Sequence, residues 1–227
     1  MLATWAACVP AAAQSWGGGV GVASDKVVRG LSQTGARPSL LLDLFYRVDN
    51  GWAISASGAT LPWAEHQTAA EWTLSLARVW QLDDDWASQL SATHYGYPGY
   101  PDARYRPYDE LSASIAWRGR FSLLASVAPH NTGQGRDRLA VHGTSAWFEA
   151  AAHAPLQGRW SLDAGLGWHN NKAIGGTPYP YGSLGTSWGQ GPLLLSLTWI
   201  TSRANERGRV PVRIAGNRWV AAAWWSW

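Results

Sequence analysis

The chain has 227 residues and a formal net charge of +3 at pH 7, with 17 Trp residues and a charged fraction of only 15%. It contains no run of 18 apolar residues, which excludes a conventional transmembrane helix. The length suits one large all-β domain. The basic excess falls in the segments between the expected strands, so we expect no nucleic-acid partner.

Residues 1–13 are uncharged and rich in alanine, and they are typical of a signal peptide cut after Ala13. The usual basic start is missing, which leaves either a translation start further upstream or a clipped segment. Residues 14–227 are then expected to form one barrel domain. Cys8 lies within the expected leader, so we expect a mature domain without disulfides.

Alternating stretches from Trp16 onward predict about twelve strands. Their expected ranges are 18–29, 39–48, 52–61, 69–80, 86–96, 108–118, 121–129, 143–154, 160–169, 179–188, 193–202 and 217–227. Short turns alternate with longer connections, which is typical of an up-and-down outer-membrane barrel. We therefore predict an all-β fold, a transmembrane antiparallel barrel with short periplasmic turns and long extracellular loops. A soluble β-sandwich is the alternative.

Aromatic residues cluster beside the short turns, where indole and phenol rings would meet lipid headgroups. The expected membrane anchors are Tyr46, Trp52, Trp80, Trp86, Trp117, Trp160, Trp188, Trp225 and Trp227. Trp227 also ends the chain, and a terminal aromatic residue resembles the signal that the outer-membrane assembly machinery reads. We expect the outer membrane of a Gram-negative bacterium as the location.

The side-chain period of two assigns each strand residue to a face. Outward positions include Trp72, Leu74, Leu76, Leu162, Leu166, Leu195, Ala223 and Trp225, and Trp224 is assigned to the inner face. The charged residues expected to line the lumen are Asp25, Arg29, Asp43, Arg47, Glu71, Glu110, Glu149, Asp163 and Arg218. These charges fit either a polar channel that selects solutes or an ion-pair network that fills the interior. Asp25 and Arg29 are expected to pair on one strand face.

Residues 24–34 read Ser-Asp-Lys-Val-Val-Arg-Gly-Leu-Ser-Gln-Thr. This stretch resembles the opening Ser-Asp-x-Val-x-Arg-Gly-x-Ser-Gln-Thr of the proteobacterial Gcw_chp family, with weaker echoes at 97–99, Glu110 and Glu149. The resemblance implies an outer-membrane β-barrel whose biochemical activity is not established. Lys26 departs from the pattern, which has an aromatic residue there, and a lysine is costly on a lipid-facing strand.

The long connections carry many arginines. The expected extracellular basic residues are Arg104, Arg106, Arg136, Arg138, Arg207 and Arg209. Guanidinium groups suit phosphate, so we expect contact with outer-membrane lipid and lipopolysaccharide. A vestibule that attracts anionic solutes is the alternative.

The expected function is a narrow, passive, porin-like channel for small solutes, or an envelope structural protein. We expect no enzyme, cofactor or metal, because HExxH and zinc-ligand spacings are absent from the sequence. The alternative is an outer-membrane hydrolase, directed at lipid or peptide, with a histidine site at the extracellular rim. His142 with Ser145, or His130 with Asp137, would supply that site.

Overall fold

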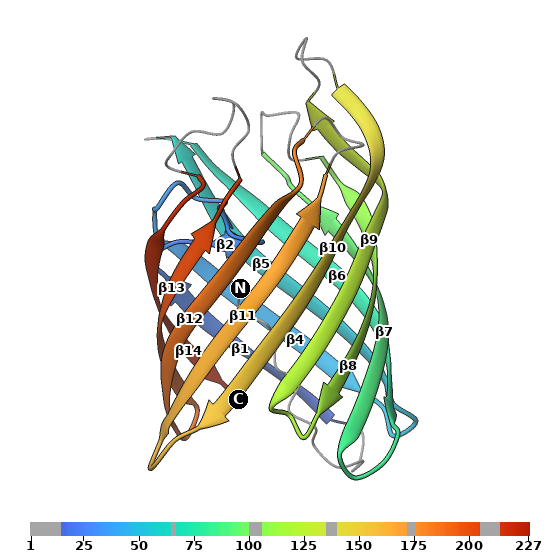
Figure 1. Ribbon diagram of the computed structural model, residues 1–227, viewed down its shortest axis with the longest axis vertical. Coiled ribbons are helices and arrows are strands. Elements are labelled where there is room, and N and C mark those ends of the chain that lie inside the picture. Colours follow the sequence, from blue (N-terminus) through green and yellow to red (C-terminus); the bar gives the residue numbers. More distant parts are fainter. Residues whose placement is uncertain (1–14, 65–66, 100–105, 135–139, 172–175, 205–213) are drawn as a thin grey trace.

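The computed structural model describes residues 15–64, 67–99, 106–134, 140–171, 176–204 and 214–227. Within them, 12 strands close into an antiparallel barrel (Figure 1). These strands are β1 (Ser15–Ala23), β4 (Ser39–Arg47), β5 (Trp52–Ala64), β6 (Gln67–Gln81), β7 (Trp86–Gly96), β8 (Tyr108–Trp117), β9 (Phe121–Gln134), β10 (Ala140–Pro155), β11 (Trp160–Asn170), β12 (Tyr179–Gln190), β13 (Leu193–Ser202) and β14 (Arg218–Ser226). Strands adjacent in the barrel sequence pair with one another, and β1 pairs with β14 to close the sheet. The predicted fold class is confirmed.

The predicted strand boundaries agree closely with the structure, with two kinds of difference. Strand β9 continues to Gln134 and strand β10 begins at Ala140, so both run into a segment that we expected to be a loop. The first strand, expected to run through residue 29, ends at Ala23. That prediction is wrong because the chain leaves the wall at this point and turns into the barrel.

The outer face of the barrel is apolar, as the alternation predicts. Leu74, Leu76 and Leu166 are 47%, 51% and 73% exposed, and Trp225 of the closing strand is 52% exposed. A row of apolar side chains on this face fits a hydrocarbon surrounding. The described part of the chain holds no helix long and apolar enough to cross a membrane.

The seam between β1 and β14 shows why the first strand is rich in glycine. Val20 lies opposite Trp225, and Gly21 lies opposite Trp224. A Cβ atom at Gly19 or Gly21 would overlap the Trp224 ring. Because Trp225 is exposed and Trp224 is packed over these glycines, the predicted faces of the last strand are confirmed.

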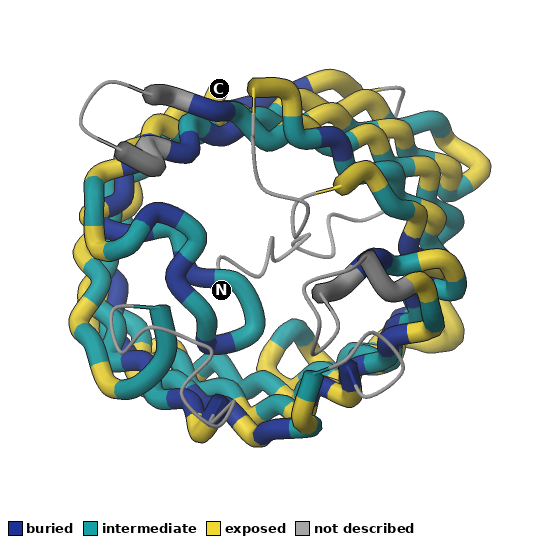
Figure 2. Tube along the Cα trace, turned by 90° about the horizontal axis from the view of Figure 1, so that it is seen from above, coloured by how far each residue is buried: buried dark blue, intermediate teal, exposed yellow. Residues whose placement is uncertain are grey.

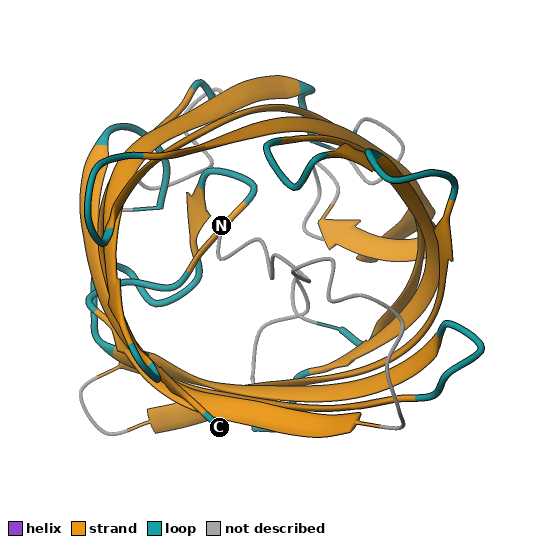
Figure 3. Cartoon of the chain, turned by 90° about the horizontal axis from the view of Figure 1, so that it is seen from below, coloured by secondary structure: helices purple, strands orange, loops and turns teal. Residues whose placement is uncertain are grey.

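Residues 24–38 form a loop that folds into the lumen, seen inside the ring of strands in Figures 2 and 3. Two short strands, β2 (Val27–Val28) and β3 (Leu31–Ser32), pair within it as a hairpin. Arg29 and Gly30 form the two-residue turn, with φ of 50° and 74°. Positive φ at both turn residues is typical of a type I′ hairpin, in which glycine is favoured.

Candidate functional site: an ion-paired hairpin across the lumen

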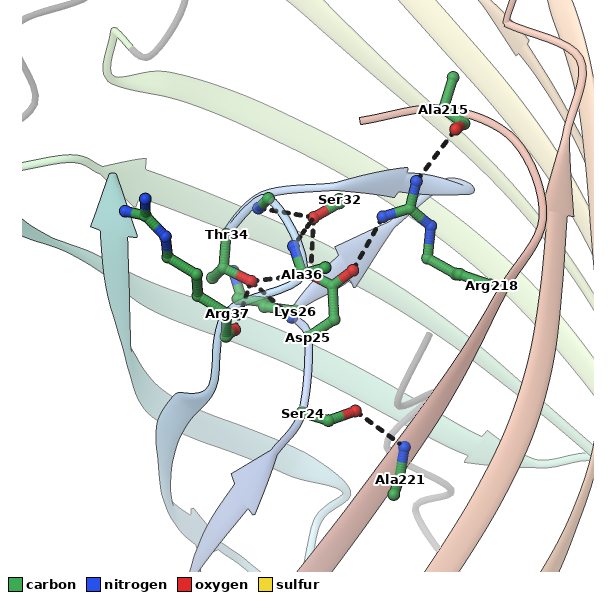
Figure 4. A network of polar contacts seen from close by, with 11 residues as sticks. Ser24, Asp25, Lys26, Ser32, Thr34, Ala36, Arg37, Ala215, Arg218 and Ala221 are labelled. Atoms are coloured by element: carbon green, nitrogen blue, oxygen red, sulfur yellow. Dashed lines mark hydrogen bonds and ion pairs between the residues drawn. The ribbon is translucent and has the colours of Figure 1, made fainter. Parts of the chain in front are cut away.

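The root of the hairpin is organised around the carboxylate of Asp25, which is 4% exposed. Its Oδ1 accepts hydrogen bonds from Ser32 Oγ at 2.6 Å and from Thr34 Oγ1 at 2.7 Å. Its Oδ2 accepts from Arg218 Nη1 of β14 at 2.8 Å (Figure 4). A buried carboxylate is tolerated when it is paired and fully hydrogen-bonded. Asp25 therefore fixes the hairpin to the wall at β14.

The tip of the hairpin is held on the far wall through Arg29. Its Nη2 donates to Glu110 Oε2 of β8 at 2.8 Å, and its guanidinium carbon lies 3.3 Å from the ring centroid of Trp147 on β10. Trp147 is 1% exposed, and a second donor, Ser112 Oγ, lies 2.9 Å from Glu110 Oε1. The Arg29 side chain is thus held by an ion pair with β8 and by a cation–π contact with β10.

Gly30 wedges the tip against two other strands. A Cβ atom at this position would lie 2.6 Å from the Cβ atoms of both Tyr181 on β12 and Ser202 on β13. With its φ of 74°, Gly30 has both the backbone conformation and the close contact that only glycine allows. The hairpin therefore touches the wall over β8, β10, β12, β13 and β14.

Lys26 completes the attachment. Its Nζ donates to Glu71 Oε1 of β6 at 2.5 Å, and both side chains are mostly buried. The concern about a lysine on the lipid-facing side does not apply, because Lys26 lies on the inward loop. Three ion pairs thus connect the hairpin to β6, β8 and β14, on widely separated parts of the wall.

The expected pair between Asp25 and Arg29 is not formed, so that prediction is wrong. Asp25 pairs with Arg218, and Arg29 pairs with Glu110. Strand periodicity puts Asp25 and Arg29 on one face only while the strand continues. The strand ends at Ala23, so both residues lie on the loop and not on the wall.

Two further lumen carboxylates have hydroxyl or imidazole hydrogen-bond partners. Tyr181 donates its hydroxyl to Glu149 Oε1 at 2.5 Å. Ser187 Oγ donates to Asp163 Oδ2 at 2.9 Å, and His153 Nδ1 lies 2.7 Å from Asp163 Oδ1. These contacts put Glu149 and Asp163 on the inner wall, in agreement with the predicted parity.

Asp43 and Arg47 share the inner face of β4. Asp43 lies opposite Ser57 of β5, and the Arg47 guanidinium carbon lies 5.0 Å from the Phe45 ring centroid. Between the hairpin and the short turns, the inner wall carries many small hydroxyl side chains. They include Ser55, Ser57, Ser75, Ser91, Ser112, Ser114, Ser122, Ser126, Ser161, Ser187 and Ser196. Small polar side chains leave more space for water than the hairpin does above them.

The expected anchors lie where the short turns begin and end. Tyr46, Trp52, Trp80, Trp86, Trp160, Trp225 and Trp227 are between 38% and 52% exposed. Trp117 stacks on Phe121 across a short turn, with ring centroids 5.8 Å apart. Trp188 of β12 lies opposite Trp160 of the neighbouring strand β11. Their role at a membrane interface stays a prediction.

Of the expected basic loop residues, Arg106 is described and exposed. The others lie outside the described residues, namely Arg104, Arg136, Arg138, Arg207 and Arg209. In the part of the chain that is described, no group of three His, Cys, Asp or Glu side chains is arranged to hold a metal ion.

The expected histidine pairs at the rim are only partly described. His142 Nδ1 lies 3.2 Å from Thr132 Oγ1, whereas Ser145 Oγ accepts from Asn131 at 2.8 Å. The proposed pairing of His142 with Ser145 is therefore wrong. Asp137, the expected partner of His130, lies outside the described residues.

A different histidine pair, which the sequence did not single out, lies on the outer face. His94 Nδ1 is 2.8 Å from Asp109 Oδ1, and Trp72 lies beside the imidazole with ring centroids 5.1 Å apart. His94 and Asp109 are cross-strand partners on β7 and β8, near the end of the barrel away from the short turns. Their separation of 15 residues carries no motif that would have revealed them.

Sequence reasoning also missed Trp147, Tyr181 and the inward hairpin. The available signal was the Arg29-Gly30 dipeptide, with a glycine at its second position, between Val27-Val28 and Leu31-Ser32. No sequence signal joins Arg29 to Glu110 or Trp147, because these partners come from distant strands.

Comparison with solved structures finds outer-membrane barrels. A KdgM porin in complex with disordered oligogalacturonate aligns with a TM-score of 0.56 and 7% identity, over 94% of this chain and 99% of that chain. A TodX deltaS2S3 mutant, a monoaromatic hydrocarbon channel, aligns with a TM-score of 0.50 and 8% identity, over 94% of this chain and 90% of that chain. LpxR from Salmonella typhimurium aligns with a TM-score of 0.49 and 9% identity, over 93% of this chain and 99% of that chain. No family model and no curated protein matches the chain. At these identities the likeness shows the fold, a barrel of the outer-membrane type.

Proposed function

We propose that the protein is a narrow passive channel in the outer membrane of a Gram-negative bacterium, with residues 24–38 as its constriction. The observation that carries the proposal is the hairpin attached by ion pairs to β6, β8 and β14 above a serine-lined wall. A barrel that served only as an envelope structure would need no serine-lined wall beneath such a loop. The porin and channel among its structural neighbours support the same class.

The test is permeation of neutral solutes through proteoliposomes. Swelling rates should fall steeply as the sugar is enlarged from a pentose to a trisaccharide, because the hairpin limits the passage. Vesicles with heat-denatured protein are the control. Swelling no faster than in the control for every sugar would favour the envelope structural role.

The resemblance to the Gcw_chp family becomes part of this proposal. Its matching positions include Asp25, Arg29, Gly30, Ser32 and Thr34, which build the hairpin through the contacts described above. A motif with this structural role supports membership, with Lys26 as a variation that adds a third ion pair.

We also propose the partners of the barrel. The exposed rings beside the short turns are suited to the periplasmic headgroup region as an aromatic girdle, and Trp227 to recognition by the assembly machinery. Arginines in the long connections are suited to lipopolysaccharide phosphates.

The second candidate function is hydrolysis of a lipid at the outer face, favoured by the contact between His94 and Asp109. A carboxylate on Nδ1 orients an imidazole as a general base through its other nitrogen. Among the described residues, no nucleophilic hydroxyl is hydrogen-bonded to His94, so water would have to be activated. Release of fatty acid from phospholipid vesicles, lost in His94→Ala and kept in His142→Ala, would establish this activity.

A further inference from the structure

Among the described residues, the lumen carboxylates fall into two groups, those bridged to a lysine or arginine and those with hydroxyl or imidazole partners. The bridged group consists of the pairs Lys26–Glu71, Arg29–Glu110 and Arg218–Asp25, with N–O distances of 2.5, 2.8 and 2.8 Å. Each pair places a cation directly on a carboxylate, so its field largely cancels a few ångströms away. Solutes in the passage respond mainly to the charges that are left over.

The carboxylates without a lysine or arginine partner in the described part of the chain lie along the passage itself. Glu149 accepts from the Tyr181 hydroxyl, Asp163 accepts from the Ser187 hydroxyl beside His153, and Asp43 faces Ser57 across β4 and β5. Hydroxyl donors stabilise a carboxylate without cancelling its charge. Glu149 and Asp163 lie on the neighbouring strands β10 and β11, and Asp43 lies on β4 across the barrel, so the three carboxylates face the lumen from two sides.

Two arginines oppose them, at the two ends of the passage. Arg47 is the last residue of β4, next to a short turn. Arg37 lies at the foot of the hairpin before β4, and its side chain points away from the Asp25 network in Figure 4. The described lumen and hairpin therefore hold six carboxylates and five cationic groups, with the surplus negative charge between the two ends.

From this arrangement we infer that the channel passes small cations in preference to anions, and that Asp43, Glu149 and Asp163 are its selectivity residues. Carboxylates on a wall of low dielectric constant concentrate cations and repel anions in a narrow aqueous path. The inference rests on the proposed channel function and adds the charge class of the solute.

The test is the reversal potential of the refolded protein in a planar bilayer under a KCl gradient at pH 8, which keeps the imidazole contribution small. The wild type should show a K⁺/Cl⁻ permeability ratio above 1, on the order of a few-fold. The combined variant Asp43→Asn, Glu149→Gln, Asp163→Asn should lower the ratio to about 1 or below. Arg47→Ala should change it in the opposite direction. Asp84→Asn, which removes an exposed charge in a short turn, should leave it unchanged.

The outcomes separate the two claims. Conductance steps with a ratio below 1, or a ratio that the combined variant and Glu149→Gln alone both leave unchanged, would overturn the cation preference and leave the channel intact. The absence of any steps in wild type and in Arg47→Ala would overturn the channel, and the preference with it.

Discussion

Arg29 and Glu110 are 81 residues apart in the sequence, and the structure joins them through a 2.8 Å ion pair inside the barrel. Arg29 is at the tip of a hairpin that begins at β1, and Glu110 is on β8 across the lumen. The pair is therefore a strut that holds the hairpin in the passage. It makes the position of the hairpin a defined part of the fold.

The first prediction concerns the strength of this strut. Arg29→Ala leaves the carboxylate of Glu110, whose side chain is 7% exposed, without its cation. Loss of one partner of a buried pair should lower the free energy of unfolding by about 3–5 kcal/mol. Urea unfolding in detergent, followed by Trp fluorescence, measures the loss.

Two variants serve as controls for that measurement. Arg29→Gln combined with Glu110→Gln removes both charges and should recover much of the loss. Arg118→Ala breaks a solvent-exposed pair with Asp85 in the short turns and should have little effect. An Arg29→Ala variant as stable as wild type would mean that the pair contributes nothing to the fold.

The second prediction concerns the wedge at Gly30. Gly30→Ala adds a methyl group 2.6 Å from the Cβ atoms of Tyr181 and Ser202, so the hairpin tip must move off the wall. Gly119→Ala is a matched control, because Gly119 has a φ of 63° and nothing within 4 Å of the added atom. The free energy of unfolding of the control should fall only by what an alanine costs in a left-handed backbone conformation, about 1–2 kcal/mol. Gly30→Ala should lose more stability than the control and should widen the channel. Equal losses of stability in the two variants would mean that the close contact of Gly30 with Tyr181 and Ser202 does not hold the hairpin tip.

The sequence was sufficient to predict the barrel and insufficient to predict the hairpin inside it. Alternation in β6, where Leu74 and Leu76 are outward and Thr73 and Ser75 inward, is a local pattern that specifies both strand and face. The hairpin does not follow from such a pattern, because β1 ends at Ala23 and Val27 and Val28 belong to a separate short strand that the Arg29-Gly30 turn pairs with Leu31 and Ser32. Its partners on β6, β8 and β14 are known only once the barrel closes.

The third prediction tests the two faces of the closing strand. Ala223→Arg places a charge on the outer face beside Val22, where a mid-bilayer guanidinium costs roughly 2–4 kcal/mol and less near the rim. Ala222→Arg, one residue away on the inner face, should cost less because water reaches it. Stability in lipid bilayers, measured by urea titration, compares the two. A larger loss for Ala222→Arg would reverse the assigned faces.

The fourth prediction separates assembly from stability at the end of the chain. The backbone of Trp227 exchanges two hydrogen bonds with Gly18, at 3.3 and 3.0 Å, at the margin of the β1–β14 seam. Deleting Trp227 should reduce the amount inserted into the outer membrane in cells far more than it lowers stability in detergent. Fractionation and unfolding of the same variant give both values. Normal insertion with a large loss of stability would make Trp227 a structural residue only.

Single-channel conductance shows whether residues 24–38 restrict the channel. A variant in which residues 26–36 are replaced by a short Gly-Ser link keeps the barrel strands and removes the hairpin that bridges them. We expect this variant to insert as a folded barrel, judged by heat-modifiable migration on a gel, and to conduct several times more current than wild type. Equal conductance from an equally folded variant would show that the hairpin does not limit the passage.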